Sequence, residues 1–340
     1  MKLLKNQKFF VWIFILAIIV IVLGCQILYR KYIMVDFVWK YDLLNPIIKY
    51  NEWENLMKEK EIDFKTMIEN YVNLKLNRWE IEHVSVYFRS LNNGDRIGIN
   101  EKEYFSPASL MKLPILISYL KKSESEKGLL EKKVIYKKND QYEETFNQNF
   151  EPIKDLENGK EYTFKELLEY MIRYSNNEAA IVLQENINLE QILATFYDVW
   201  LWFPVLVDWK FDNNIKVKDY ATFFRILFNS SYLNKENSEW ALELLSTTVF
   251  NDGIKEVLPK NIQVAHKFGE RWIIWPDGTE QKQLHDCGII YYPQHPYILC
   301  LMTRWYDWDK LKWILQDISK IVYDQIENSY SNLSHWIFGD

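Results

Sequence analysis

The chain has 340 residues, of which 48% are hydrophobic and 26% charged, so it can form one large folded domain or two small ones. Its net charge of -6 argues against a nucleic-acid partner, and its low counts of glycine (10) and proline (9) exclude collagen-like and low-complexity chains. The three cysteines, at positions 25, 287 and 300, are too few for a disulfide framework and match no zinc-ligand spacing. No metal or other cofactor is expected.

The N-terminal segment predicts a membrane anchor. Phe9–Leu28 is an uncharged run of 20 residues, and a helix of that length is about 30 Å long, which is the thickness of a bilayer core. Three lysines lie within residues 1–8, and by the positive-inside rule they keep this end in the cytoplasm. We therefore expect a single-pass protein of the cytoplasmic membrane, with a signal anchor at 9–28 and an extracytoplasmic catalytic domain.

Two alternatives to a retained anchor stay open. One is a cleaved signal peptide, for which no small-x-small site is present; the other is a lipoprotein signal in which Cys25, after Val22, Leu23 and Gly24, is lipidated. Leu23 is bulky for such a signal, which favours the anchor. Residues 29–60 are expected to form a stalk or linker, and residues 61–340 the folded domain.

The folded domain is predicted to begin and end with strands. Residues 84–90 form a strand pattern, Asn93-Gly94 predicts a hairpin turn, and Arg96–Ile99 fits the returning strand. Towards the C-terminus, three further β-rich runs precede a helical pattern. The runs span residues 262–268, 287–292 and 298–303, and the helical pattern spans residues 308–326.

The intervening region has helical patterns. Ser106 is expected to cap a helix that has Pro107 at its first position, and Thr163 and Glu166 form a capping box. Further helices are predicted at residues 178–186, 218–228 and 236–246. Segregated strands and helices predict an α+β fold, in which an antiparallel sheet of about five strands from both chain ends is flanked by helices and carries an inserted all-helical lobe.

A Ser-x-x-Lys pair is the candidate catalytic feature. On a helix, residues i and i+3 share a face, so a lysine amine with a lowered pKa can take the proton of the serine hydroxyl. The spacing occurs twice, at Ser109/Lys112 and at Ser118/Lys121. The first pair follows Ser106-Pro107 at a helix start, where free backbone N–H groups favour negative charge. The second lies deeper in the helix, and we interpret its serine as structural.

The segment Phe105–Pro114 (FSPASLMKLP) resembles the nucleophile segment of class A β-lactamases and related penicillin-binding proteins. Two further motifs follow in that family's order. Ser175-Asn176-Asn177 is similar to the Ser-Asp-Asn box, and Lys267-Phe268-Gly269-Glu270 is similar to the strand that carries Lys-Thr-Gly. The resemblance covers residues 80–325 and implies the β-lactamase/transpeptidase-like fold.

The resemblance also implies roles for the residues of these motifs. Ser109 would be the acylated nucleophile, Lys112 its general base, Ser175 a proton relay and Lys267 an electrostatic partner of Ser175 and of the substrate carboxylate. Three positions would bind substrate: Asn177 through its amide, unless it only caps a helix, and Gly269 and Glu270 on the strand. The backbone N–H groups of Ser109 and Glu270 would form the oxyanion hole.

Two departures from the family pattern bear on turnover. Phe268 replaces the threonine of the strand motif, which weakens carboxylate recognition. The interval 200–214 lacks the glutamate that activates the deacylating water, and Asp208 or Asp212 are the available substitutes. Slow deacylation is therefore expected. Cys287 and Cys300 lie on consecutive predicted strands, and buried free thiols are favoured over a disulfide.

These observations predict a membrane-anchored serine hydrolase that forms an acyl-enzyme at Ser109 with a β-lactam or a D-Ala-D-Ala-like peptidoglycan stem peptide. The main alternative is a non-catalytic cell-wall-binding module that retains the fold. A third possibility is full β-lactamase activity with an unrecognised base.

Overall fold

The computed structural model describes most of the chain after residue 53. The described residues are 54–78, 80–138, 149–150, 153–201, 206–207, 210–211, 215–274 and 277–338. The predicted anchor at 9–28, together with Cys25, Asp208 and Asp212, lies outside this set. Within these ranges, no helix has both the length and the apolar character needed to cross a membrane.

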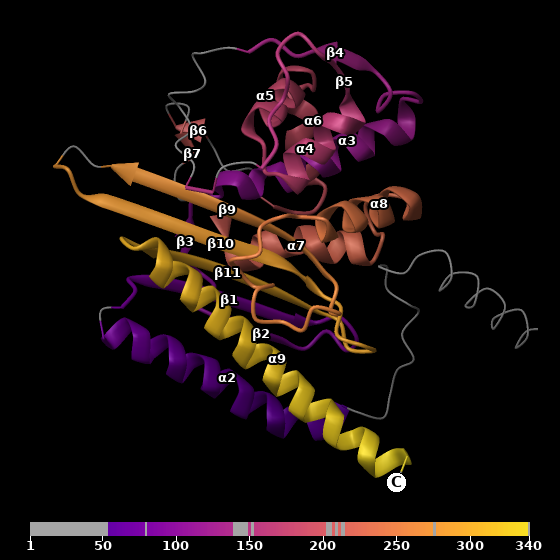
Figure 1. The fold of residues 1–340 in the computed structure, drawn as a ribbon. Helices are drawn as coiled ribbons and strands as arrows, with labels where there is room; N and C mark the ends of the chain where they lie inside the picture. The colour runs from indigo at the N-terminus through magenta and orange to yellow at the C-terminus, as the bar shows by residue number, and fades with distance from the viewer. Residues whose placement is uncertain are drawn as a thin grey trace, which may run out of the picture.

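A five-stranded antiparallel sheet in the order β2-β1-β11-β10-β9 forms the middle layer (Figure 1). Its strands are β1 (His83–Ser90), β2 (Arg96–Ile99), β9 (Val264–Ile274), β10 (Glu280–Ile290) and β11 (Tyr297–Trp305). The sheet thus combines both ends of the chain, as predicted. The last strand in sequence, β11, lies between β1 and β10, and β9 is an edge strand.

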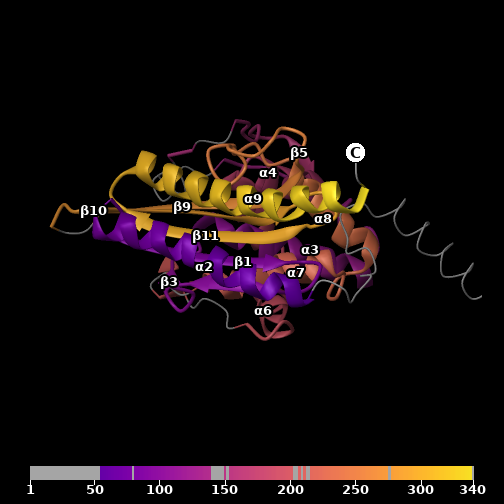
Figure 2. The same ribbon diagram turned by 90° about the horizontal axis from the view of Figure 1, so that it is seen from below.

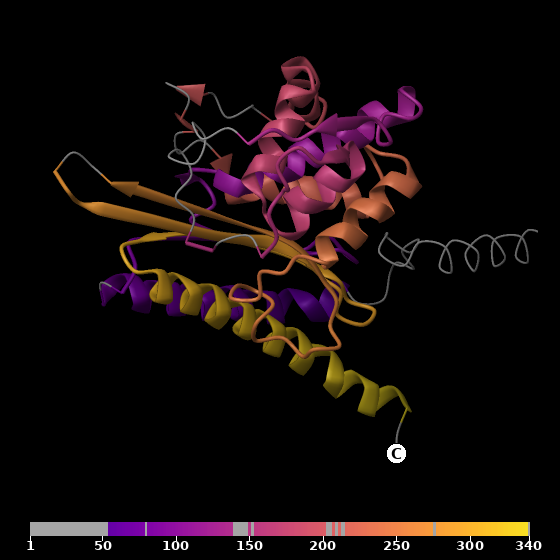
Figure 3. The same ribbon diagram turned by 45° about the horizontal axis from the view of Figure 1, so that its top comes forward.

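Helices cover both faces of the sheet (Figures 1 and 3). The helices α2 (Glu54–Asn77) and α9 (Trp308–Phe338) lie together on one face, which Figure 2 shows from their side. The other face carries the inserted lobe. Its helices are the 3-10 helix η1 (Ala108–Met111), α3 (Lys112–Ser125), α4 (Phe164–Arg173), α5 (Asn177–Glu185), α6 (Leu189–Tyr197), α7 (Val217–Phe228) and α8 (Lys235–Ser246).

The inserted lobe is not wholly helical, which corrects the prediction. Short strand pairs tie its loops together: β3 (Tyr104–Phe105) with β8 (Ile215–Lys216), β4 (Lys133–Ile135) with β5 (Glu161–Thr163), and β6 (Leu206–Val207) with β7 (Lys210–Phe211). The β4–β5 pair leads into α4, whose capping box forms as predicted: Thr163 Oγ1 accepts from the Glu166 N–H, and Glu166 accepts from the Thr163 N–H.

The alternation of side chains along β11 explains why its sequence is a continuous apolar run. Successive side chains of a strand point to opposite faces. Ile298 and Met302 pack in the core under the inserted lobe, whereas Leu299 and Leu301 pack in the core under α2 and α9. Each of these side chains is fully buried, and such burial contributes roughly 1.5–3 kcal/mol apiece. The sheet is thereby packed on both faces against helices.

Helix α2 begins inside the range expected to be a linker. Its apolar residues Phe64, Ile68 and Val72 recur every four residues and are buried against the sheet. Tyr71 donates a hydrogen bond to Asp317 of α9 at 2.5 Å, so the two helices are also joined by a polar contact. Residues 54–60 of the range expected to be a stalk or linker are therefore helical.

Candidate active site

The predicted nucleophile segment is a 3-10 turn and not the start of an α-helix. Ala108 has a φ of 46°, and η1 follows Pro107 without a side-chain cap. The expected capping by Ser106 is therefore wrong: its N–H donates to Gln283 Oε1 at 3.0 Å and its carbonyl lies 3.0 Å from His285 Nε2, both on β10. A non-glycine residue in the left-handed region is strained, and such strain persists only where the surroundings hold it. The turn is thus held in place by the sheet.

Lys112, the first residue of α3, is 4% exposed. Its Nζ donates to Ser175 Oγ at 3.1 Å, to Asn177 Oδ1 at 2.7 Å and to the Ser175 carbonyl. Burial holds the pKa of Lys112 well below its usual range, and the nearby charge of Lys267 lowers it further, while Glu270 opposes the shift. A buried amine with a lowered pKa is suited to accept a proton near neutral pH.

Ser175 lies between α4 and α5 with a φ of 54°, and it is fully buried. The N-cap of α5 is Asn176, whose Oδ1 accepts from the Ala179 N–H at 2.8 Å. Helix capping by Asn177, the alternative role considered for it, is therefore not observed. Because Asn176 supplies the cap, the amide of Asn177 is left to bind Lys112.

Lys267 approaches the same serine from the edge strand β9. It is fully buried, and its Nζ donates to Ser175 Oγ at 2.9 Å and to the Phe268 carbonyl at 2.8 Å. Burial lowers the pKa of Lys267 to about 7, against the opposing charges of Asp286 and Glu270. The hydroxyl of Ser175 is thus shared by two lysines whose charge is easily lost, which is the arrangement of a proton relay.

The structure therefore brings four of the predicted site residues into one hydrogen-bonded network, Lys112, Ser175, Asn177 and Lys267. Ser109 lies one turn before Lys112 and is partly exposed. In the part of the chain that the structure describes, its hydroxyl makes no hydrogen bond to another residue. Ser109, the candidate nucleophile, is thus partly exposed to solvent beside this hydrogen-bonded network.

Gly269 brings β9 against the nucleophile segment. A Cβ at this position would lie 3.0 Å from the Leu110 backbone nitrogen and 3.1 Å from the Pro107 carbonyl oxygen, distances that leave no room for a side chain. Only glycine allows the strand and the 3-10 turn to approach so closely. The backbone N–H groups on either side of this contact are those predicted to form the oxyanion hole.

The side chain of Glu270 has a role that the sequence analysis did not identify. Its carboxylate accepts hydrogen bonds from the backbone N–H groups of Asn149 and Phe150, both at 3.0 Å. Burial raises the pKa of Glu270, and these hydrogen bonds and the two lysines oppose the rise. The carboxylate thereby ties the segment at residues 149–150 to the strand that carries Lys267.

Phe268 contacts the lysine next to it. Its ring stacks on Phe250 with centroids 4.0 Å apart, and Phe150 packs edge-on against both rings. The Nζ of Lys267 lies 4.1 Å from the Phe268 ring centroid, which is within the range of a cation–π contact.

The second Ser-x-x-Lys pair has only structural contacts. Ser118 Oγ donates to the Pro114 carbonyl at 2.7 Å and lies 2.8 Å from Thr195 Oγ1. Lys121 binds Glu124 and the Tyr232 carbonyl. These contacts therefore agree with the interpretation of this pair as structural.

Cys287 and Cys300 form a disulfide, which corrects the expectation of free thiols. They are directly opposite each other on β10 and β11, and both side chains point to the face of the inserted lobe. Cys287 is also the register partner of Lys267, so the disulfide lies beside the candidate site. Among the described residues, no group of three or more His, Cys, Asp or Glu side chains could hold a metal ion.

Comparisons with known proteins identify the family of this chain. A family model described as the β-lactamase enzyme family matches residues 65–326. Among curated relatives, β-lactamase VEB-1 of Pseudomonas aeruginosa is 25% identical over 285 residues, which cover 77% of this chain and 89% of that protein.

Solved structures share the fold at low sequence identity. PBP-A is 20% identical with a TM-score of 0.65, and the match covers 78% of this chain and 96% of PBP-A. A class A β-lactamase from Bacteroides cellulosilyticus is 19% identical with a TM-score of 0.66, over 78% and 99% of the two chains. A PBP-A variant, solved as an acyl-enzyme complex with penicillin G, is 20% identical with a TM-score of 0.64, over 78% and 97%.

Proposed function

Because the chain belongs to the β-lactamase enzyme family and is a serine hydrolase of the kind that acts on amide bonds, we propose that it forms an acyl-enzyme at Ser109 with β-lactams or with D-Ala-D-Ala-like stem peptides of peptidoglycan. The observation that carries the proposal is the buried network in which Lys112 and Lys267 share the hydroxyl of Ser175. The penicillin G acyl-enzyme of the PBP-A variant supports β-lactams as substrates.

In the proposed acylation, neutral Lys112 takes the proton of the Ser109 hydroxyl as its oxygen attacks the carbonyl carbon. The three acceptors around Lys112 Nζ match the three protons of an ammonium, so the lysine is stabilised once it is charged. The backbone N–H groups of Ser109 and Glu270 receive the oxyanion, and loss of one such donor typically costs ~10²–10³ in rate. Ser175 then passes a proton from Lys112 to the leaving nitrogen as the carbon–nitrogen bond breaks.

We propose that deacylation is slow. It needs a base that activates water, and residues 200–214 contain no glutamate to serve as one. Loss of a general base typically costs ~10²–10⁴ in rate. The acyl-enzyme is then expected to accumulate, which is penicillin-binding behaviour more than rapid destruction of the antibiotic.

Labelling with a fluorescent penicillin tests the acylation proposal. The full chain is expected to be labelled at Ser109, with no labelling of Ser109→Ala and strongly slowed labelling of Lys112→Ala. The matched controls are Ser118→Ala and Lys121→Ala, which change the second pair and should leave the labelling rate within about twofold after correction for the folded fraction. Absence of labelling by several β-lactams would refute the proposal.

Intact-mass measurement over time separates the proposed function from its alternatives. A persistent adduct of one β-lactam supports slow deacylation, whereas an adduct that disappears with rapid nitrocefin turnover indicates a full β-lactamase. The third outcome is a non-catalytic wall-binding module, an alternative that rests on the replacement of threonine by Phe268. That module would bind peptidoglycan fragments equally well as wild type and as Ser109→Ala, without any adduct.

We further propose that residues 9–28 anchor the protein in the cytoplasmic membrane with the hydrolase domain outside. The uncharged run and the lysines before it support this. Fractionation of cells that express the full chain should place it in the membrane, and removal of residues 1–28 should release it. Loss of membrane attachment on Cys25→Ser alone would instead identify a lipoprotein.

A further inference from the structure

A pocket lies between α7 and the strands β1 and β2, away from the candidate active site. Its floor is Tyr87, which is 5% exposed, and the pocket contains about 370 Å³ of space including its open mouth. Tyr87 pairs with Cys300, Cys300 with Cys287, and Cys287 with Lys267, so three strand spacings, roughly 14 Å, separate this floor from Lys267. The pocket is therefore distinct from the acylation site.

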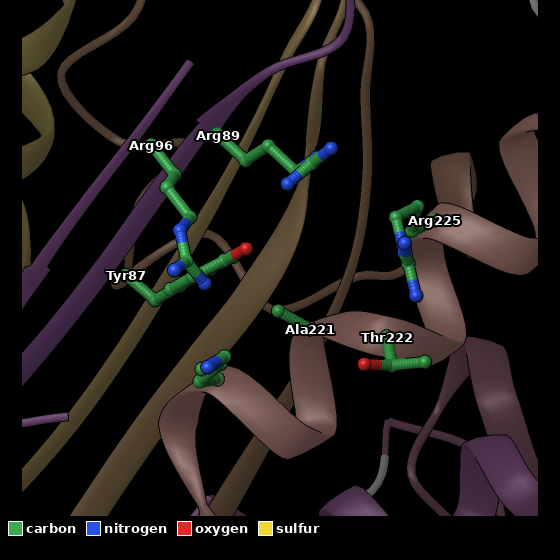
Figure 4. Close-up of a pocket in the computed structure, with 7 residues that line it drawn as sticks. Tyr87, Arg89, Arg96, Ala221, Thr222 and Arg225 are labelled. Atoms are coloured by element: carbon green, nitrogen blue, oxygen red, sulfur yellow. The ribbon is translucent and has the colours of Figure 1, made fainter. Parts of the chain in front are cut away.

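Four cationic side chains line this pocket, and no carboxylate does. Arg89 and Arg96 come from the strands and Arg225 comes from α7 (Figure 4). Lys218 also comes from α7. None of the four makes a hydrogen bond or an ion pair with any residue that the structure describes. Asp219, which follows Lys218 on α7, is not among the lining residues, although its charge interacts with that of Lys218. In a chain with a net charge of -6, three arginines gathered without an ion pair are not explained by overall composition.

The local geometry concentrates this charge. Arg89 and Arg96 are directly opposite each other on β1 and β2, and like charges at such a pair destabilise a sheet. On α7, Lys218 and Arg225 are seven residues apart and share a face. A bound anion would relieve the repulsion on both sides of the pocket at once.

The remaining lining residues make room and supply hydroxyl donors. Ala221 and Thr222 are small, and they leave the space between α7 and the sheet open. Figure 4 shows the Tyr87 hydroxyl directed from the strand towards α7, and Thr222 adds a second hydroxyl from the helix. Hydroxyls and guanidinium groups together provide many donors around one small volume.

We infer that this pocket binds the phosphate group of a small phosphate or phosphate ester. Guanidinium groups bind phosphate oxygens in bidentate fashion, and three of them offer more donors than the two oxygens of a carboxylate accept. The size of the pocket suits a single anionic group and not an extended polymer. This site is independent of the acylation chemistry proposed above.

Isothermal titration of the purified full chain, in nonionic detergent and phosphate-free buffer, tests the inference. Inorganic phosphate and glycerol 3-phosphate serve as separate probes of the free ion and of an ester. Saturable binding of either at one site per chain is expected, at least about tenfold weaker in Arg89→Gln and in Arg225→Lys. The lysine variant keeps the charge, so its loss of affinity would identify guanidinium recognition.

Matched controls separate a site from general charge attraction. Arg78→Gln removes the same charge from an exposed position after α2 and should leave affinity unchanged. Ser109→Ala should bind phosphate as the wild type does, even though it cannot be acylated. Arg96→Gln should raise the melting temperature without phosphate and reduce the stabilisation that phosphate adds.

Three results would overturn the inference. One is the absence of saturable binding of both probes. Another is an equal loss of affinity in Arg78→Gln and Arg89→Gln, which would indicate unspecific attraction. The third is binding only to phosphatidylglycerol vesicles, which would make the cluster a membrane-facing patch.

Discussion

Replacement of Gly269 by alanine tests whether the close packing of β9 on η1 positions Ser109. The added Cβ would lie 2.9 Å from Leu110 Cγ, 3.0 Å from the Leu110 backbone nitrogen and 3.1 Å from the Pro107 oxygen. Two of these three neighbours are backbone atoms of the nucleophile segment, so the strand and the turn must separate by several tenths of an ångström.

The expected cost has two parts. Overpacking of this kind destabilises by about 1–3 kcal/mol. The displacement also moves the backbone N–H groups of Ser109 and Glu270 away from the position of the developing oxyanion, and misplacement by about 1 Å can cost ~10²-fold in rate. We therefore expect the second-order rate constant of acylation to fall by roughly tenfold to a hundredfold.

The assay is stopped-flow labelling with a fluorescent penicillin, with thermal melting of the same samples. Gly128→Ala is the control: its φ of 77° disfavours alanine through the backbone, but nothing lies within 4 Å of the added Cβ. It should lose stability and keep its acylation rate. If Gly269→Ala acylates within twofold of the wild type, the contact between β9 and η1 does not position the nucleophile.

Three further predictions follow from the site and the sheet. Asn176→Ala should lose about 1 kcal/mol of stability because it removes the N-cap of α5, with little effect on the acylation rate of the folded protein. Asn177→Ala should instead slow acylation and keep the melting temperature. Identical effects of the two variants would contradict the assignment of these residues. Because the pKa of Lys267 is about 7 in the folded protein and near 10.5 when unfolded, the unfolded chain binds more protons between these values. Between pH 7 and 10, the free energy of unfolding of the wild type should therefore rise relative to that of Lys267→Met, by at most about 1.4 kcal/mol per pH unit. Urea titrations at several pH values measure both proteins, and parallel pH profiles would refute the prediction. Removal of the disulfide by Cys287→Ala with Cys300→Ala should cost about 2–4 kcal/mol in urea unfolding, and an unchanged midpoint would show that the crosslink does not stabilise the sheet.

Local signals in the sequence were sufficient to predict the strands of the sheet and the capping box of α4. The hairpin of β1 and β2 follows from Asn93-Gly94, and the position of Thr163 before Glu166 predicts where α4 begins. Both depend on residues that are close in the chain. Helix α2 had a comparable signal in the four-residue spacing of Phe64, Ile68 and Val72, from which no helix was predicted.

Other features depend on contacts between distant segments. Asn176 and Asn177 have the same side chain, and only the fold around Ser175, whose backbone is left-handed, shows that Asn176 caps α5 and Asn177 binds Lys112. Ser106 has the residue type of a helix cap, but its backbone is held by β10. Pairing of Cys287 with Cys300 required the register of two strands.

The charged side chains illustrate the same limit. The carboxylate of Glu270 binds backbone more than a hundred positions away, at Asn149 and Phe150. The pocket cations Arg89 and Arg225 come from a strand and a helix that meet only in the folded protein. Neither arrangement has a spacing pattern that a single sequence could reveal.

The placement of β11 between β1 and β10 has a consequence for the order in which the enzyme becomes competent. Ser109 and Lys112 are synthesised early, but the ammonium of Lys267 arrives on a strand that needs β10 as its neighbour, and β10 joins β1 only through β11. Contacts so far apart in the chain form late in folding. A nascent polypeptide thus carries Ser109, the proposed nucleophile, without the strand that supplies Lys267, and we expect reactivity only when the C-terminal strands have docked.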